Sequence, residues 1–425
     1  MIPTERLSAA GNMEGAPPLP HRLRANLRVP GHPGLWQVRR KPTTTSIAID
    51  VSTVFTFDGE GRPWSTLLKG IHYRRGLDGG VRARAADEGP AGRRWLSPAE
   101  ALELWEHVHS QVRLLLAGLE AATFEADQLP VPVGPELDVL LRRVLSWDTP
   151  RLAGDVAEFA ELYTSVPILP PDRYNALLVQ ITRGCAWNRC TFCHLYRDRP
   201  YEVRSREGLD EHLARIRAFF GQGLQARRHL FLGDANLLAV PASRLLPMVA
   251  RVRAEFPESA FRELSAFTDV LGPSRHTDDD LRALAGHGLQ HIYFGLESGS
   301  DDVRSLLGKA GDAADAIAAV RRLRQCGLSV GMIILLGAGG DGLAQEHAEE
   351  TVRALSSMSL DSGDIVFFSP LRSGGRYQQQ VQARGLGSLS EADMQKQRQT
   401  IESLLTPRAD GGPRRAAYDV EDFVY

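Results

Sequence analysis

The chain has 425 residues, of which 43% are hydrophobic, and this length leaves room for two or three domains with full cores. Lysine and arginine (50) nearly balance aspartate and glutamate (52), so the overall charge indicates neither a nucleic-acid partner nor an anionic membrane. No stretch approaches the roughly 18 to 20 apolar residues of a membrane span. The start, MIPTERLSAAGNMEG, lacks the apolar core of a signal peptide, and we expect a cytoplasmic protein.

The N-terminal part of the chain changes character near residue 45. Residues 1–44 are rich in Pro, Gly and Arg without apolar periodicity, which predicts a poorly ordered or surface-draped arm. From Ser46 the β-branched run SIAIDVSTVFTF is followed by turn signals at residues 58–61 and 78–80, a pattern typical of an antiparallel meander. We expect residues 45–165 to form a small α+β accessory domain.

Helices close this accessory domain. Ser97, Pro98 and Glu100 have the spacing of a capping box with proline at the first helical position, which predicts a helix to about residue 121. Further helices are predicted over residues 135–147 and 154–163. Prolines then break the pattern, and residues 166–173 are expected to be a linker.

After the linker, strand-like and helix-like segments alternate six times. This alternation predicts a parallel sheet with right-handed crossovers, and six units of this length suit a partial (β/α)6 barrel over residues 174–371. Ligands gather at the carboxyl ends of strands in such folds. Residues 372–425 are expected to form an extension with a helix near 391–405 and a terminal strand in YDVEDFVY. The six expected strands are 175–181, 228–233, 261–267, 291–297, 329–337 and 364–370.

Three of the four cysteines, Cys185, Cys190 and Cys193, lie within nine consecutive residues, in the loop after the first barrel strand. Clustered thiols in a reducing compartment indicate a metal or redox site rather than a disulfide scaffold. Three thiolates can hold three irons of a cubane and leave the fourth iron open for a ligand. Gly184 would give the backbone the freedom to turn around such a cluster.

The segment ITRGCAWNRCTFC resembles the cluster loop of the radical S-adenosylmethionine (SAM) superfamily, and the resemblance extends over roughly residues 174–371. Most members space their cysteines C-x-x-x-C-x-x-C, whereas this chain has C-x4-C-x2-C. The longer loop resembles an uncharacterised subgroup related to HemN and Elp3-like enzymes. The resemblance implies a [4Fe–4S] cluster on Cys185, Cys190 and Cys193, with SAM as second cofactor and Phe192 near its adenine.

Further barrel segments resemble the SAM-binding elements of that superfamily. Leu232–Asn236 is placed like the motif that holds the SAM amino group, which implies roles for Gly233, Asp234, Ala235 and Asn236. The segment GLESGSD starting at Gly295 is similar to the ribose-binding element. The other implied contacts are Glu297, Ser298, Lys309, Ser265 and, in the adenine-flanking strand, Ile333.

Each element has a plainer interpretation as well. Cys185, Cys190 and Cys193 could hold zinc with His194 or Cys326, although Cys326 is more typical of a buried small hydrophobe. The Gly233–Asn236 segment could be an ordinary turn that starts a helix, and Lys309 a solvated surface charge. Ile333 could belong to a core strand and the loop that follows it. The joint order of the four elements along the chain favours the SAM interpretation.

The resemblance implies reductive cleavage of SAM to methionine and a 5′-deoxyadenosyl radical, which abstracts hydrogen from a substrate. It also implies a flavodoxin-type or ferredoxin-type electron donor and a small-molecule or peptide substrate. The substrate stays open: a porphyrin role follows only from kinship with HemN, and fold kinship does not establish function. Residues 46–165 are expected to serve as a lid or substrate module. The alternative is a zinc- or cluster-binding regulatory protein without turnover.

Overall fold

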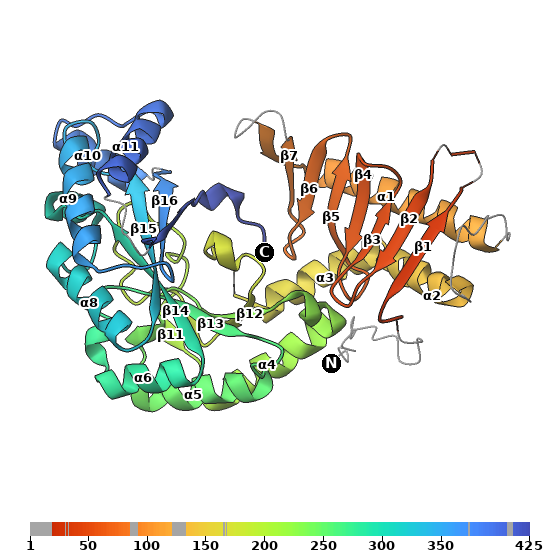
Figure 1. The fold of residues 1–425 in the computed structure, drawn as a ribbon, viewed down its shortest axis with the longest axis horizontal. Coiled ribbons are helices and arrows are strands. Elements are labelled where there is room, and N and C mark those ends of the chain that lie inside the picture. Colours follow the sequence, from red (N-terminus) through yellow and green to blue (C-terminus); the bar gives the residue numbers. More distant parts are fainter. Residues whose placement is uncertain are drawn as a thin grey trace, which may run out of the picture. The chain divides into compact units, whose positions relative to one another are not determined.

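The computed structural model describes residues 19–85, 92–120, 133–372, 375–405 and 411–425, apart from the single residues 30, 33, 165 and 167. The chain divides into two compact units. Unit 1 comprises residues 1–164, 215–226 and 424–425, and unit 2 comprises residues 165–214 and 227–423. Figure 1 shows both units, and each is described by itself below.

Unit 1 contains an eight-stranded sheet whose strands pair in chain order, each antiparallel to the next. Its core joins buried strand residues such as Val38, Ile47 and Phe55 to buried residues of the helices, such as Val108 and Leu140. The expected meander and α+β character are therefore present. The strands are β1 (Leu23–Leu27), β2 (Trp36–Arg40), β3 (Thr45–Ala48), β4 (Thr53–Phe57), β5 (Pro63–Leu68), β6 (Ile71–Arg75), β7 (Val81–Ala85) and β8 (Arg93–Trp95).

The expectation of an arm over residues 1–44 is wrong for β1 and β2. Residues of these strands alternate between buried and more exposed positions, and Trp36 is fully buried. Their outward positions carry arginine and glutamine, and the connection between them contains Pro and Gly. The polar composition of this segment therefore does not reveal two short strands, in which apolar residues occur only at inward positions. Residues 1–18 lie outside the described residues.

The helices of unit 1 are α1 (Pro98–Glu120), α2 (Val133–Leu145) and α3 (Thr149–Leu162). The predicted capping box is present: the Ser97 backbone N–H donates to Glu100 Oε2 (2.8 Å), and the Glu100 N–H donates to Ser97 Oγ (3.3 Å). Helix α3 begins earlier than expected, because the Asp148 side chain caps it and accepts from the Arg151 N–H, with proline in its first turn.

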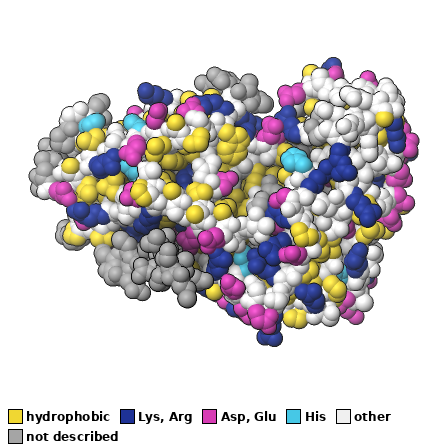
Figure 2. Space-filling model, turned by 180° about the vertical axis from the view of Figure 1, so that it is seen from behind, with side chains coloured by type: hydrophobic (Ala, Val, Ile, Leu, Met, Phe, Trp, Pro, Cys, Tyr) yellow, Lys and Arg dark blue, Asp and Glu magenta, His cyan; other side chains and the backbone are white. Residues whose placement is uncertain are grey.

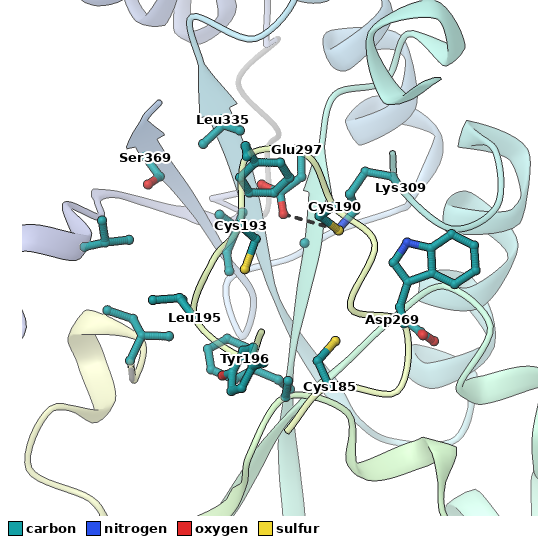
Figure 3. A pocket seen from close by; sticks show the side chains of 18 of the residues that line it. Cys185, Cys190, Cys193, Leu195, Tyr196, Asp269, Glu297, Lys309, Leu335 and Ser369 are labelled. Carbon is teal, nitrogen blue, oxygen red and sulfur yellow. Dashed lines mark hydrogen bonds and ion pairs between the residues drawn. The ribbon is translucent and has the colours of Figure 1, made fainter. Parts of the chain in front are cut away.

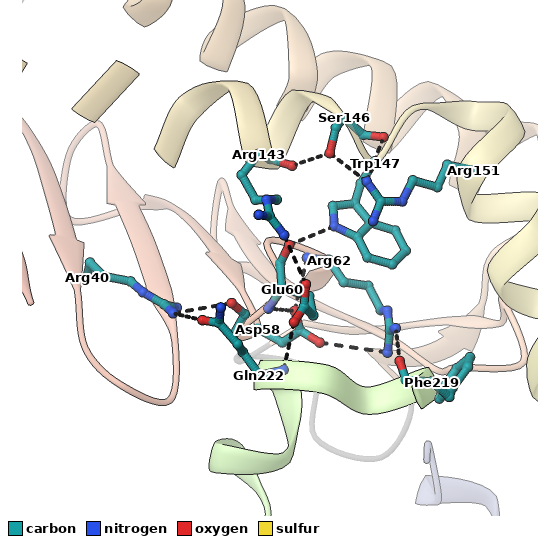
Figure 4. A network of polar contacts seen from close by, with 11 residues as sticks. Arg40, Asp58, Glu60, Arg62, Arg143, Ser146, Trp147, Arg151, Phe219 and Gln222 are labelled. Carbon is teal, nitrogen blue, oxygen red and sulfur yellow. Dashed lines mark hydrogen bonds and ion pairs between the residues drawn. The ribbon is translucent and has the colours of Figure 1, made fainter. Parts of the chain in front are cut away.

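A buried ionic network in unit 1 includes Arg62, which Figure 4 shows beside Asp58, Trp147 and Phe219. Arg62 Nε and Arg75 Nη2 each lie 3.1 Å from the carboxylate of Asp155, and all three side chains are only 3% exposed. Arg62 Nη1 also lies 3.8 Å from Asp58 Oδ2, and the guanidinium is 4.7 and 4.6 Å from the ring centroids of Trp147 and Phe219. Asp155 therefore pairs with two buried cations at once, which is costly to disturb.

Unit 2 contains a seven-stranded parallel sheet in the order β17-β16-β15-β14-β13-β12-β9. All six expected strands are present, and the expected α/β class with a parallel sheet is confirmed. Figure 1 shows α5, α6, α8 and α9 along the outside of this sheet. The sheet consists of β9 (Leu177–Gln180), β12 (His229–Gly233), β13 (Glu263–Thr268), β14 (Leu289–Glu297), β15 (Ser329–Leu336), β16 (Ile365–Pro370) and β17 (Arg414–Ala417).

Unit 2 also contains helices, one of which crosses the boundary with unit 1. Helix α4 runs from unit 2 into residues assigned to unit 1. The terminal segment YDVEDFVY contains a short 3-10 turn, Val420–Asp422, and the added strand is β17, which precedes it. The helices are α4 (Arg206–Phe220), α5 (Ala242–Glu255), α6 (Asp278–Gly286), α7 (Asp301–Leu307), α8 (Ala313–Gln325), α9 (Ala344–Ser357), α10 (Gly375–Ala383) and α11 (Glu391–Leu404).

The surface fits the balanced charge of the sequence. On the face shown in Figure 2, basic and acidic side chains are interspersed among apolar ones. Within the part of the chain that the structure describes, no helix combines the length and the apolarity needed to cross a membrane.

We predict that Asp155→Asn destabilises unit 1 by about 3 kcal/mol or more, because it removes the ion-pair partner of the buried Arg75 and leaves the buried Arg62 with the more distant Asp58 carboxylate. Urea unfolding monitored by circular dichroism measures this as an earlier transition. Asp138→Asn is the matched control, since Asp138 pairs with Arg142 at 34% and 55% side-chain exposure and should cost less than about 1 kcal/mol. Equal effects of the two substitutions would contradict the prediction.

Candidate active site

One pocket of about 240 Å³ lies within unit 2 and is lined by residues that follow β9, β12, β13, β14, β15 and β16. These positions are the carboxyl ends of the parallel strands, where the sequence predicts a site. All three clustered cysteines line this pocket, and Figure 3 shows Cys185, Cys190 and Cys193 around the same space.

The cysteine loop starts at a position that only glycine tolerates. Gly184 has a φ of +76°, and a Cβ there would lie 2.5 Å from the carbonyl oxygen of Pro200. The Gly184 N–H donates to Asp234 Oδ2 (2.9 Å), and its carbonyl accepts from the Ala235 N–H (3.4 Å). The start of the loop is therefore fixed to the end of β12.

The middle of the loop is fixed to the end of α7. The Thr191 N–H donates to the carbonyl of Leu307 (2.9 Å), and Thr191 Oγ1 donates to that of Leu306 (2.9 Å). Trp187 Nε1 donates to the carbonyl of Gly308 (2.8 Å). These carbonyls lie at the end of a helix, where no intrahelical donor reaches them. The same bonds bring the cysteine loop beside Lys309.

The thiols are poor nucleophiles in this environment. Burial raises the pKa of Cys193 to about 11, and burial raises the pKa of Cys190 although the Lys309 charge opposes it. At neutral pH these thiols stay protonated unless a metal displaces the proton. Their environment is therefore that of metal ligands rather than of a catalytic nucleophile.

The thiols are not arranged around a single ion. Among the described residues, no three His, Cys, Asp or Glu side chains form a group that could hold one metal ion. Cys326 is buried at the C-terminal end of α8 and does not line the pocket. In a cubane each cysteine binds a different iron, so its ligands need not meet at one point. Three thiols along one pocket thus fit the donor set of a [4Fe–4S] cluster.

Beside Cys190 lies an ion pair between Glu297 and Lys309, with Lys309 Nζ 3.3 Å from Glu297 Oε1. The register of β14 shifts at its end, and Glu297 has a φ of +62°. A Cβ at Gly295 would lie 2.3 Å from Glu297 Oε1 and 2.9 Å from Lys309 Nζ. Burial lowers the pKa of Lys309, but its interactions with Glu297, and to a lesser degree with Cys190, outweigh burial and raise the pKa overall. The ammonium is therefore held in the charged state.

Arg304 holds the two backbone segments that carry this ion pair. Its side chain is buried, Nη1 donates to the carbonyl of Leu296 (2.7 Å), and Nη2 donates to that of Ala310 (2.8 Å). These carbonyls belong to the neighbours of Glu297 and Lys309, so one guanidinium fixes both segments.

Asn236 lines the pocket, but its side chain is already engaged. Asn236 Nδ2 donates to Asp269 Oδ2 (2.6 Å), and Asn236 Oδ1 accepts from Thr268 Oγ1 (3.2 Å). Asp269 also lines the pocket, and its Oδ1 accepts from the N–H groups of Leu271 and Gly272. A carboxylate has about four acceptor sites, so Asp269 retains capacity for one more donor.

The pocket brings together six of the ten sequence-predicted cofactor contacts and leaves out four. The two carboxylate oxygens of Asp234 accept hydrogen bonds from Gln180 Nε2 and from the Gly184 N–H. Burial raises the pKa of Asp234 to about 6. Ser265 accepts from Arg173 Nε (3.0 Å), and Ser298 lies 2.8 Å from His347 Nδ1. The residues in the lining are Phe192, Ala235, Asn236, Glu297, Lys309 and Ile333; those outside it are Gly233, Asp234, Ser265 and Ser298.

Residues 179–355, which span the cysteine loop and strands β12 to β15, match the model of the radical SAM superfamily. The match agrees with the superfamily that the cysteine loop resembles, whose members use a [4Fe–4S] cluster and SAM. Radical SAM enzymes also need a substrate and a reductant.

Individual relatives are distant. An uncharacterised methyltransferase of Pyrococcus horikoshii is 24% identical over 217 residues, 48% of this chain and 43% of that protein. The 4′-phospho-dehydrooxetanocin synthase of Priestia megaterium is 26% identical over 214 residues, 45% of this chain and 28% of that protein. This chain thus spans less than half of the length of both curated relatives.

Among solved structures, the coproporphyrinogen III oxidase HemN of Escherichia coli is similar with a TM-score of 0.40 and 17% identity, over 59% of this chain and 60% of that chain. The subgroup related to HemN and Elp3-like enzymes stays a prediction.

Several residues of this radical SAM pocket could not be found from motifs. Trp187 and Tyr196 lie in or beside the cysteine loop, and their proximity to Cys185 and Cys193 is the one signal that could have indicated them. Asp269 follows β13, and its position at the end of a strand was the one sequence feature that could have indicated it as a pocket residue. Arg372 and Tyr418 come from the C-terminal extension, to which the sequence assigned no chemistry.

We predict that Gly184→Ala lowers cluster loading severalfold, because alanine is strained at a φ of +76° and its Cβ would meet the Pro200 carbonyl. Iron per chain and absorbance near 400 nm after anaerobic reconstitution measure the loss. Gly286→Ala is the control, since nothing lies within 4 Å of a Cβ there, and it should load normally. Full loading of Gly184→Ala would show that the loop does not need this conformation.

Proposed function

We propose that this radical SAM protein binds a [4Fe–4S] cluster on Cys185, Cys190 and Cys193 and reductively cleaves SAM to initiate hydrogen abstraction from a substrate. One observation carries the proposal: the three thiols share a pocket with the Glu297–Lys309 ion pair. The thiols supply ligands for three irons, and the ion pair supplies one acceptor and one cation beside the open fourth position.

The residues of the pocket suggest distinct roles toward SAM. The Lys309 ammonium would pair with the SAM carboxylate, and Glu297 would accept hydrogen bonds from ribose hydroxyls. Asp269 is the better candidate for the SAM ammonium than Asp234, because Asp269 lines the pocket and keeps an acceptor site, whereas Asp234 lies outside the lining. Phe192 and Ile333 would flank the adenine with apolar atoms.

When bound, the reduced cluster supplies the electron that breaks a C–S bond of SAM. The protein holds the reacting groups in a partly closed pocket and limits the access of water. Such chemistry needs the low end of the range of cluster potentials, so we propose a flavodoxin-type or ferredoxin-type protein as the electron donor.

We predict that Cys190→Ala abolishes both the cluster and 5′-deoxyadenosine formation, because two thiols cannot hold the cubane in this pocket. The assay is anaerobic reconstitution followed by dithionite, SAM and chromatography. Cys326→Ala is the matched control, since Cys326 lies outside the pocket lining, and it should retain both properties. Formation of 5′-deoxyadenosine by Cys190→Ala at the wild-type rate would refute the proposed function.

We predict that Lys309→Gln weakens SAM binding about 10-fold to 100-fold, because it removes a charge-assisted contact worth about 1.5–3 kcal/mol. Equilibrium dialysis with the cluster-loaded protein measures the dissociation constant. Lys396→Gln, at a side chain that is 75% exposed on α11, should leave SAM binding unchanged. Unchanged binding by Lys309→Gln would remove Lys309 from the SAM site.

A further inference from the structure

The pocket has two walls of different chemistry, and the strand order separates them. Strands β12, β13 and β14 lie on one side of the sheet and lead to Asn236, Asp269 and Glu297. Strands β15, β16 and β17 follow on the other side, and the pocket-lining residues at their carboxyl ends form what we call the second wall. The second wall consists of Leu335, Ser369, Pro370, Leu371, Arg372, Tyr418 and Val420.

The second wall is mostly apolar and continuous with the protein interior. Leu335 belongs to a buried cluster with Val303, Tyr377 and Val381, and Leu371 and Phe192 pack against the same cluster. Ile168 and Leu195 extend the apolar lining of the pocket beyond this wall. In Figure 3, Leu335, Ser369 and Leu195 lie away from Asp269 and Lys309.

Arg372 is the one charged side chain among the described residues of the second wall, and the protein itself neutralises it. Arg372 Nη2 donates to Asp419 Oδ2 (2.8 Å), and Nη1 donates to Glu391 Oε1 (2.9 Å). Glu421 Oε2 lies 3.8 Å from Arg372 Nε. Hydrogen bonds to Asp419 and Glu391 raise the pKa of Arg372, and three carboxylates around one guanidinium leave no positive charge for a ligand.

The Tyr418 hydroxyl of the second wall is also engaged, since it donates to the carbonyl of Leu169 (3.1 Å). Lys309, Glu297 and Asp269 lie on the opposite wall, which the proposed function assigns to SAM. An ionic group on the second wall would lose its hydration, because an anion would meet a guanidinium already paired with carboxylates and an ammonium would meet carboxylates that already pair with Arg372.

We propose that the part of the substrate that enters this pocket is an uncharged, apolar group, either aliphatic or aromatic, and that it packs against the second wall. The inference rests on the proposed function, because it assigns the β12–β14 side to SAM. It excludes a substrate that presents a carboxylate, a phosphate or an ammonium group at the second wall.

The test compares three probes of one shape: 4-phenylbutan-1-ol, 4-phenylbutyrate and 4-phenylbutylamine. Their dissociation constants are measured by calorimetric titration of the cluster-reconstituted protein in the presence of SAM. The neutral alcohol should bind at least tenfold more tightly than either ion. Absence of measurable alcohol binding, or equally tight binding of either ion, would overturn the inference.

Charged substitutions in the second wall locate the binding. Leu371→Lys should weaken alcohol binding and strengthen 4-phenylbutyrate binding at least tenfold. Val420 is already 37% exposed, so this position tolerates a charge. Val420→Glu should weaken alcohol binding and strengthen 4-phenylbutylamine binding at least tenfold. Leu404→Glu, at a 48% exposed position on α11 outside the pocket lining, is the control. Affinities that stay at control values in both wall variants would overturn the inference.

Formation of 5′-deoxyadenosine by the same preparation reports separately on the proposed function. If 5′-deoxyadenosine forms but the three probes bind equally well, this inference is wrong and the proposed function stands. Selective binding of the alcohol without 5′-deoxyadenosine formation would remove the proposed function and leave an apolar ligand site.

Discussion

The placement of the cysteine loop is the constraint on which the rest of the site depends. A loop of this length has many conformations, and its thiols are useful only if they share one space. Two sets of hydrogen bonds restrict it: Gly184 bonds to the end of β12, and Trp187 and Thr191 bond to the carbonyls that end α7. Since Lys309 lies close after the end of α7, the same contacts bring the three thiols and the Glu297–Lys309 pair together.

This arrangement explains why a C-x4-C-x2-C loop can serve where most of the superfamily has one residue fewer. The distances between the thiols depend on the two points at which hydrogen bonds attach the loop. The extra residue lies between these two points. Asn188, with a φ of +46°, lies in this longer first gap, and its side chain donates to the carbonyl of Tyr196 (2.9 Å). The additional backbone is thus folded within the loop.

Residues in local motifs were predictable from the sequence, and residues set by long-range packing were not. The six barrel strands and the three cysteines follow from short local patterns, and Glu297 and Lys309 were each named from a resemblance, although not as an ion pair. Asp234 sits in a predicted motif, yet its carboxylate points to Gly184 and Gln180, because the motif fixes the position along the chain and not the direction of the side chain. Tyr418 reaches the pocket through the pairing of β17 with β16, which no local pattern specifies. Strands β1 and β2 were missed because arginines occupy their outward positions.

The absence of a side chain at Gly295 has a consequence for anyone who wishes to redesign this protein. The atoms of the Glu297–Lys309 pair occupy the volume that a methyl group at residue 295 would need. Even alanine at position 295 would therefore displace the pair. Changes to the shape of the cavity are better made at other residues of its lining, such as Ala235 and Leu195.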